Sequence, residues 1–139
     1  MDKSEKQQKG MILILTTLFH LLATIPPFTS THPFRYPYMS MVVATTFLSA
    51  IWHLKGQPEG LLLYLDYSFT AIWFFYDMGL ICNLPNIDKA KIITASFSVL
   101  CLHEVCSAEE NYAVYHSLWH IASAVKCLYV SFNIFTADP

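Results

Sequence analysis

The chain has 139 residues, of which 55% are hydrophobic and 13% are charged, and its formal net charge at pH 7 is -2. Soluble domains carry about 25% charged residues and keep much of their surface polar at this size, so the composition indicates a membrane protein. There is no excess of Lys and Arg, which excludes nucleic acid as a partner held by phosphate contacts.

Five apolar segments approach the length of about 20 residues that a membrane-spanning helix needs. In chain order they are 11–28, 38–54, 61–82, 92–106 and 112–135. The connections between them are short, so consecutive helices are expected to be antiparallel. We therefore predict an all-α fold: a multi-pass transmembrane helical bundle of about five spans that forms a single domain over residues 1–139.

The first segment, 11–28, follows a lysine-rich stretch, as the apolar part of a secretory signal peptide does. The apolar run is long for a signal, and no small-residue cleavage pattern precedes the double proline at 26–27. These features favour a spanning helix, with a cleaved signal as the alternative. The remaining helices keep the same orientation in either case.

Ionisable side chains inside an apolar segment are costly and mark candidate functional sites. Here they are His20, His53, Asp66, Asp77, His103, Glu104, His116, His120 and Lys126. Asp77 and Lys126 lie at comparable depth, so we expect them to form a pair or to reach the membrane interface separately. His20 is expected to be a core or interface histidine, and the stretch "CLHEVC" to be interface packing.

Two pairs of polar residues have helical spacing. His116 and His120 in "YHSLWH" are four residues apart, which places both imidazoles on one face of a helix, within reach of one metal ion. Ser49 and His53 in "SAIWH" repeat this spacing near the end of segment 38–54. A single buried histidine more often hydrogen-bonds a neighbouring helix, but two such pairs favour a site.

The depth of these groups in the bundle also agrees. Asp66 follows His53 across a short hairpin, and two further crossings bring the chain back to the same side before segment 112–135 begins. At a rise of about 1.5 Å per residue, His116 and His120 fall in the same half of the bilayer as the other two. The sequence therefore predicts one shared site.

Three histidines with an open position are typical of a catalytic zinc ion, so His53, His116 and His120 are the predicted Zn²⁺ ligands. Three neutral imidazoles leave the charge of the ion uncompensated in a low-dielectric medium, which favours a nearby carboxylate. Asp66 is predicted to supply it and to orient or deprotonate the water that the metal activates. Ser49 is placed to hydrogen-bond that water or an oxyanion.

These residues resemble the signature of the CREST superfamily, which includes alkaline ceramidases, progestin and adiponectin receptors, GPI-anchor lipid-remodelling factors and myomaker-like proteins. The family pattern is Ser-x-x-x-His on the second helix, Asp on the third and His-x-x-x-His on the last, and its counterparts here are Ser49, His53, Asp66, His116 and His120. "NYAVYHSLWHIASA" and "LKGQPEG" are most similar to the myomaker-like branch, and "LDYSFTAIWF" is similar to the GPI-remodelling branch.

The resemblance implies a zinc-dependent hydrolase that cleaves an amide or ester bond of a membrane lipid, with Asp66 as general base and Ser49 assisting the oxyanion. The alternative is a non-enzymatic receptor-like or membrane-remodelling protein in which zinc holds helices together. Either would be an integral protein of an endomembrane or the plasma membrane. The family has seven helices where this chain offers five, so the resemblance is to a shortened member. A second copy of the chain could complete the wall around the lipid, or the chain could be a fragment or a short variant.

Overall fold

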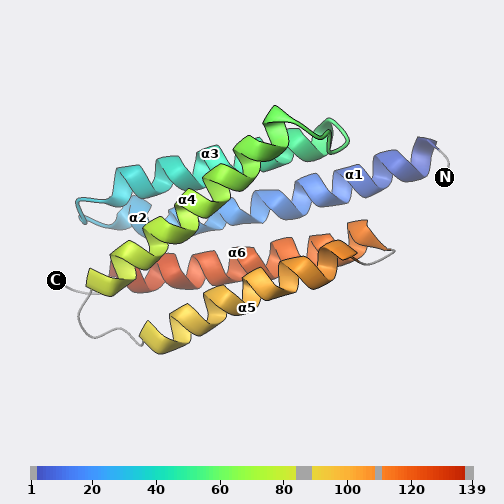
Figure 1. Cartoon of the computed structure of the whole chain (residues 1–139). Helices are drawn as coiled ribbons and strands as arrows, with labels where there is room; N and C mark the ends of the chain where they lie inside the picture. Colours follow the sequence, from blue (N-terminus) through green and yellow to red (C-terminus); the bar gives the residue numbers. More distant parts are fainter. Residues whose placement is uncertain (1–2, 84–88, 109–110, 137–139) are drawn as a thin grey trace.

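The computed structural model describes residues 3–83, 89–108 and 111–136. These residues form helices and short connections, with no strand among them, which confirms the predicted all-α class. The elements are α1 (Lys3–Leu18), the 3-10 helix η1 (Phe19–Thr24), α2 (Ile25–Thr29), α3 (Arg35–Leu54), α4 (Leu61–Asn83), α5 (Lys89–Ala108) and α6 (Tyr112–Thr136). The first three elements run on as one rod, so the bundle consists of five rods (Figure 1), and each predicted apolar segment lies inside one of them.

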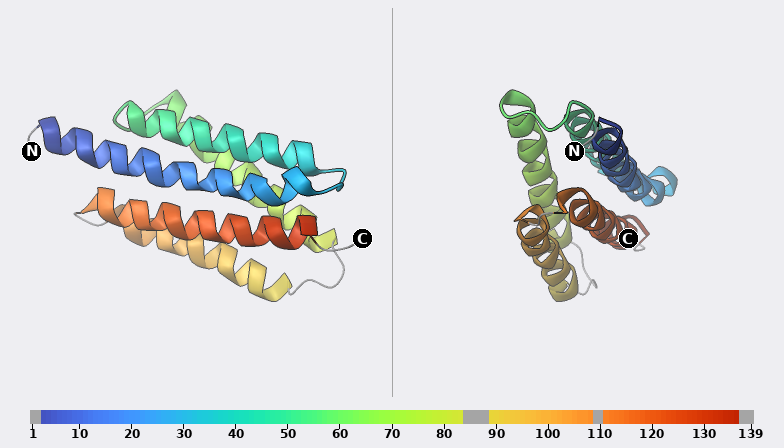
Figure 2. Two further views of the ribbon diagram at one scale, coloured as in Figure 1. Left: turned by 180° about the vertical axis from the view of Figure 1, so that it is seen from behind. Right: turned by 90° about the vertical axis from the view of Figure 1, so that its right-hand side faces the viewer.

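The first rod, α3 and α6 form the centre of the bundle, because α1 and η1 pack against both of the other two helices. The helix α4 packs on α3, and α5 packs on α6. Contacts between α4 and α5 are sparse. Figure 2 shows these two helices side by side on one flank of the three central rods.

A double proline explains why the first rod tightens into a 3-10 helix. Proline has no N–H, and its ring clashes with the carbonyl four residues earlier. Pro27 therefore leaves the carbonyl of Ala23 without an α-helical donor. The hydroxyl of Ser131 on α6 donates to that carbonyl at 2.6 Å. The rod continues through the prolines to Thr29, close to the predicted end of the segment at residue 28, and the freed carbonyl ties the rod to α6.

The apolar core and the buried polar residues occupy different parts of the bundle. The core lies where the start of α3 meets the ends of α4 and α6, and its members are Ala23, Tyr38, Val42, Trp73, Ile81, Ile92, Cys127, Val130, Ile134 and Phe135. Towards the other end the helices bury polar side chains instead, among them Thr16, Thr17, Thr45, Thr46, His53, Asp66, Ser96, His116, Ser117, His120 and Ser123. The interior thus changes from apolar to polar along the bundle.

Two expectations about buried polar residues outside the predicted site are confirmed. Lys126 Nζ lies 3.1 Å from Asp77 Oδ2, so the two form the predicted ion pair. His20 is buried, and its Nδ1 donates to the carbonyl of Thr17 at 2.9 Å. Asp77 Oδ1 is buried and has no hydrogen-bond partner among the described residues.

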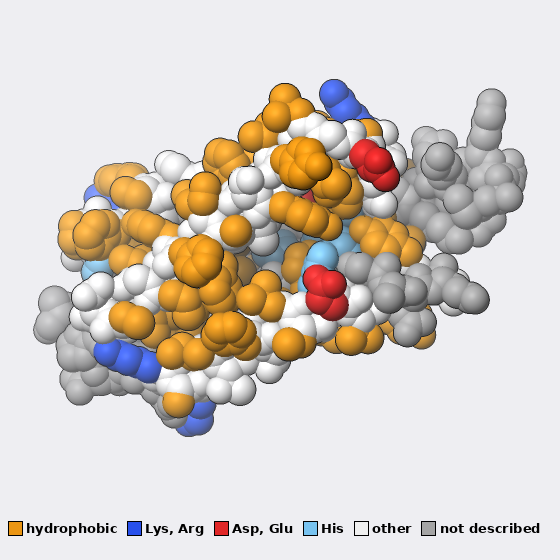
Figure 3. Space-filling model, in the orientation of Figure 1, with side chains coloured by type: hydrophobic (Ala, Val, Ile, Leu, Met, Phe, Trp, Pro, Cys, Tyr) orange, Lys and Arg blue, Asp and Glu red, His pale blue; other side chains and the backbone are white. Residues whose placement is uncertain are grey.

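Two helical segments are long and apolar enough to cross a membrane, Gly10–Thr29 and Tyr112–Thr136. In the described part of the chain, the other three rods do not reach the same combination of length and hydropathy. Large apolar side chains are nevertheless exposed on all five rods. Figure 3 shows them covering much of the face that carries α4 and α5.

The bond between Ser131 and the carbonyl of Ala23 generates a first prediction. Ser131→Ala leaves a buried carbonyl without a donor, which costs about 1–3 kcal/mol. We expect the free energy of unfolding to fall by that amount. It can be measured by titrating the protein from a mild into a denaturing detergent.

Pro27→Ala provides the control, because alanine restores an N–H that can bond the Ala23 carbonyl within its own helix. In this background the loss of the Ser131 hydroxyl should cost less. An equal cost in both backgrounds would show that the bond does not stabilise the fold.

Candidate metal centre

Three buried histidines converge in the polar half of the bundle. His53 lies in the last turn of α3, and His116 and His120 lie in the first half of α6. One ring nitrogen of each lies within 4.8 Å of the other two, and the three residues are 3%, 3% and 2% exposed. The predicted meeting of these side chains is therefore confirmed, and together they could hold a metal ion.

The three rings approach one another by their edges rather than by stacking. The ring of His53 is inclined by 67° to that of His116 and by 83° to that of His120. His116 and His120, one helical turn apart, have ring centroids 4.7 Å apart and planes at 88°. Because the nitrogens lie at the ring edges, this arrangement lets three nitrogens approach a common point.

The distances fit a metal ion closely. The Nε2 atoms of His53 and His120 are 3.0 Å apart, whereas two nitrogens bonded to a tetrahedral zinc at about 2.0–2.1 Å lie about 3.3 Å apart. The Nδ1 atoms of His116 and His120 are buried and have no hydrogen-bond partner within the described residues. Buried polar atoms are nearly always partnered, so Nδ1 of His116 is available as a ligand atom, whereas Nδ1 of His120 is the ring nitrogen opposite the Nε2 that approaches His53.

Gln57 contacts Nδ1 of His53, the ring nitrogen that does not face His120. Gln57 Nε2 lies 3.0 Å from His53 Nδ1. In this orientation the amide N–H donates to Nδ1, whereas a 180° turn of the amide places the carbonyl oxygen there, where it accepts a hydrogen bond from Nδ1–H. The second orientation leaves Nε2 of His53 free to bind a metal, as partners of metal-bound histidines commonly do.

The C-terminal turn of α3 places Gln57 there. The N–H of Gly56 donates to the carbonyl of His53 at 3.0 Å, and the N–H of Gln57 donates to that of Trp52 at 2.9 Å, which is the Schellman pattern of helix ends. Gly56 has φ 78° and Gln57 has φ 62°, a conformation that is uncommon for a residue other than glycine. The sequence analysis missed Gln57, although a glycine three residues after His53 is a recognisable helix-stop signal.

Ser49 and Asp66 lie together on neighbouring helices, and Ser49 lines the same cavity as His120. Asp66 on α4 is buried, and Ser49 on α3 is half-buried. The Ser49 hydroxyl interacts with the Asp66 carboxyl group, while Asp66 Oδ1 has no hydrogen-bond partner in the described chain. The carboxylate is not part of the mutually close set of three histidine nitrogens. The structure thus pairs the predicted acid with the predicted hydroxyl, and it does not group Asp66 with the three candidate ligands.

The first rod also contributes to the site, through residues to which the sequence analysis gave no role in it. Thr17 Oγ1 lies 3.1 Å from His120 Nε2 and donates to the carbonyl of Leu13 at 2.8 Å. The ring of His20 contacts that of His120 edge-on, with centroids 5.9 Å apart. No motif marks Thr17, because threonine is common in apolar helices and only tertiary packing brings it to His120.

No model of a known protein family, no curated protein and no solved structure matches the chain. The class of protein is therefore defined by the fold and the site: a helical bundle with a candidate three-histidine metal centre. The predicted relation to the CREST superfamily stays a prediction.

A second prediction concerns the ligands. In His116→Ala or His120→Ala, the loss of one of three ligands should reduce bound metal from about one ion per chain to background. Bound metal is measured by elemental analysis of protein purified in mild detergent. His103→Gln is the control, since the ring of His103 lies 5.6 Å from that of His116 but is not in the triad. Equal metal content in all four proteins would contradict the assignment.

A third prediction concerns Gln57. Loss of a hydrogen-bond partner behind a metal-bound histidine typically weakens metal binding about 10- to 100-fold. We expect that loss in Gln57→Ala, measured by competition with a chelator, and recovery in Gln57→Glu, which keeps an acceptor at this position. Lys55→Ala is the control in the same turn. An unchanged affinity in Gln57→Ala would show that the contact does not position His53.

Proposed function

We propose that the chain is a multi-pass membrane protein with an intramembrane zinc centre that hydrolyses an amide or ester bond of a lipid. The observation that carries this proposal is the convergence of His53, His116 and His120 from two helices. Three protein ligands leave a coordination position for a substrate or water, which distinguishes catalytic from structural zinc sites.

The distribution of side chains supports a membrane location. Large apolar residues are exposed on all five rods, whereas threonine, serine, histidine and aspartate side chains are buried between them. Soluble proteins rarely expose apolar patches of this extent, while membrane bundles turn their ionisable groups inward. Together with the two segments long enough to span, this supports a bundle that lies in a membrane.

Zinc is the proposed ion because of the donor set and its neighbours. Imidazole nitrogens also suit copper, iron and nickel. Three histidines together with a carboxylate and a hydroxyl, however, are typical of zinc sites that catalyse hydrolysis. The same five residues match the signature of the CREST superfamily. The resemblance supports zinc, and it also supports a lipid as the substrate.

The chain supplies the remaining groups for hydrolysis. A bound zinc ion would polarise the scissile carbonyl and make water a stronger nucleophile. Asp66 accepts a proton from the attacking water through its unpartnered oxygen. Protonation of Asp66 releases the Ser49 hydroxyl from the carboxyl group, and this hydroxyl then donates a hydrogen bond where negative charge develops on the carbonyl oxygen. A carbon–oxygen bond forms and the carbon–nitrogen or ester carbon–oxygen bond breaks. The proton held by Asp66 then passes to the amine or alcohol that leaves.

The flank formed by α4 and α5 offers a lateral approach for the lipid. The two helices contact each other only sparsely, and much of the surface on this side is apolar (Figure 3). A long-chain lipid that lies in the bilayer could therefore present its carbonyl to the centre without leaving the membrane.

A fourth prediction tests catalysis. We expect the zinc-loaded protein to release fatty acid from one class in a panel of ceramides, phospholipids and lysolipids, measured by mass spectrometry. Asp66→Asn keeps the shape of the side chain but cannot accept the proton, so the rate should fall about 10²- to 10⁴-fold at unchanged zinc content. Glu104→Gln makes the same change at an exposed carboxylate and should keep the parent rate.

Two outcomes would contradict the catalytic roles. Activity that survives Asp66→Asn would show that Asp66 is not the general base. Zinc-loaded protein that cleaves no lipid class would favour the second candidate function, in which zinc stabilises a receptor-like or membrane-remodelling bundle.

A further inference from the structure

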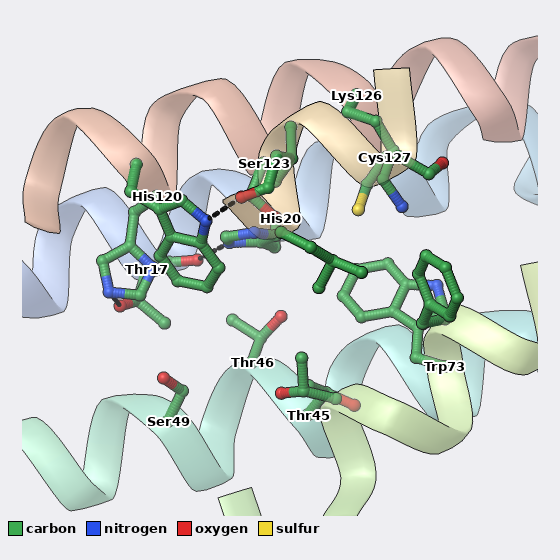
Figure 4. Close-up of a pocket in the computed structure, with 16 residues that line it drawn as sticks. Thr17, His20, Thr45, Thr46, Ser49, Trp73, His120, Ser123, Lys126 and Cys127 are labelled. Atoms are coloured by element: carbon green, nitrogen blue, oxygen red, sulfur yellow. Dashed lines mark hydrogen bonds between the residues drawn. The ribbon is translucent and has the colours of Figure 1, made fainter. Parts of the chain in front are cut away.

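The first rod brings a hydroxyl group to the candidate metal centre. The buried stripe of this rod is formed by Leu13, Thr16, Thr17 and His20, at the spacing of one helix face. Thr17 is 1% exposed, and its Oγ1 lies 3.1 Å from Nε2 of His120. Figure 4 shows the two side chains next to each other at one end of a cavity of about 60 Å³, which both of them line. A third helix therefore reaches the centre that α3 and α6 form.

The proton of the Thr17 hydroxyl is already in use. Thr17 Oγ1 donates to the carbonyl oxygen of Leu13, one turn earlier in α1, at 2.8 Å. Threonine often makes this bond inside a helix, and the bond fixes the side-chain rotamer. A hydroxyl has one proton and two lone pairs. Thr17 therefore faces His120 as an acceptor only, with the oxygen lone pairs held in place.

Nε2 of His120 makes two short contacts at once. Thr17 Oγ1 lies 3.1 Å from it and Nε2 of His53 lies 3.0 Å from it. A neutral imidazole nitrogen either carries one proton or offers one lone pair, so this atom can form a good hydrogen bond with only one of the two partners. A cation at the point where the lone pairs converge would satisfy both contacts. Ligand atoms of one tetrahedral zinc ion are about 3.3 Å apart, which is close to both separations.

We propose that Thr17 Oγ1 is a fourth donor atom of the metal centre, beside the three imidazoles. Threonine and serine hydroxyls bind metal ions elsewhere, as in the phosphate-binding loop whose hydroxyl contacts Mg²⁺. The bond to Leu13 polarises the hydroxyl and makes its oxygen a stronger donor.

The assignment rests on the proposed zinc centre and adds to its function. A neutral oxygen suits zinc less well than imidazole does, so a lipid carbonyl or water can displace Thr17 from the ion. Catalytic zinc sites can also expand to five ligands. The hydroxyl therefore occupies the fourth position in the resting protein without closing the centre to a substrate.

Thr17→Cys tests the position of the side chain. A thiolate binds zinc and similar ions at about 2.3 Å, so a cysteine that faces the ion should become a ligand. With Co²⁺ as the metal, a sulfur–cobalt bond gives a charge-transfer band in the near ultraviolet. The parent should lack this band, because no cysteine of the described chain belongs to the close group of candidate ligand atoms. We expect the band in Thr17→Cys at about one cobalt per chain.

Thr16→Cys is the matched control. Thr16 is the adjacent residue, is also buried, and makes the same kind of bond to the carbonyls of Ile12 and Leu13. Its hydroxyl is not in contact with a histidine of the triad among the hydrogen bonds of the described residues. Thr16→Cys should therefore bind cobalt without the sulfur–cobalt band.

The affinity for Zn²⁺ tests the oxygen itself, and it is measured by competition with a chelator in the absence of lipid. Thr17→Val keeps the shape of the side chain and removes the oxygen, so the affinity should fall about 10- to 100-fold. Thr17→Ser should restore it. Thr16→Val loses an equivalent bond to the backbone and should keep the parent affinity.

Two results would overturn the fourth donor. One is a cobalt-loaded Thr17→Cys protein without the band. The other is equal zinc affinity in the parent and in Thr17→Val, since Thr17 would then only accept a hydrogen bond from His120. If Thr17→Cys does not fold, the valine and serine variants decide.

Lipid cleavage is measured separately on the same proteins. Affinity that depends on Thr17 in a chain that cleaves no lipid would support the fourth donor and refute the hydrolase. Cleavage by the parent with unchanged affinity in Thr17→Val would refute only the fourth donor, and a parent that binds no metal would refute both.

Discussion

The 3.0 Å separation between the Nε2 atoms of His53 and His120 constrains the whole bundle. It requires the last turn of α3 and an early turn of α6 to lie at the same level, although two helices separate them in the chain. Central packing of both helices against the first rod meets that requirement. The helices α4 and α5 return the chain to the level at which α6 must begin. The helix α4 also brings Asp66 beside Ser49, which lies on the same helix as His53. The level at which His53 meets His120 therefore also sets the level of Ser49 and Asp66.

The partition of side chains follows from the same arrangement. The core around Tyr38, Val130 and Ile134 stabilises one end of the bundle by burying apolar surface. The other end buries groups that cost free energy unless they are bound to something. Such an interior is costly in a protein selected for stability alone, and real proteins accept this cost mainly at functional sites. Ser131 shows the opposite case, since its hydroxyl satisfies a carbonyl that a proline had freed.

Two kinds of feature could be predicted from the sequence: those that depend on local periodicity, and those that depend on how many helices lie between two segments. Each of the five apolar segments lies inside one rod, and the spacing of His116 and His120 placed them on one face towards His53. The contributions of Thr17 and Gln57 could not be predicted, because they depend on which side chains meet after packing and on a helix-end conformation with positive φ. The tightening at η1 was not predicted, because an apolar segment indicates the length of a helix and not its type.

The ion pair of Asp77 and Lys126 has a consequence for the opposite end of α4. This helix has few other contacts with α6, so the buried ion pair fixes the position of α4 along the axis of α6. Asp66 lies on the same helix, eleven residues or about 16 Å away at about 1.5 Å per residue. The position of Asp66 along the bundle is thus governed by an attachment point three turns distant, and a shift of that point by one turn would carry the carboxylate about 5.4 Å away from Ser49.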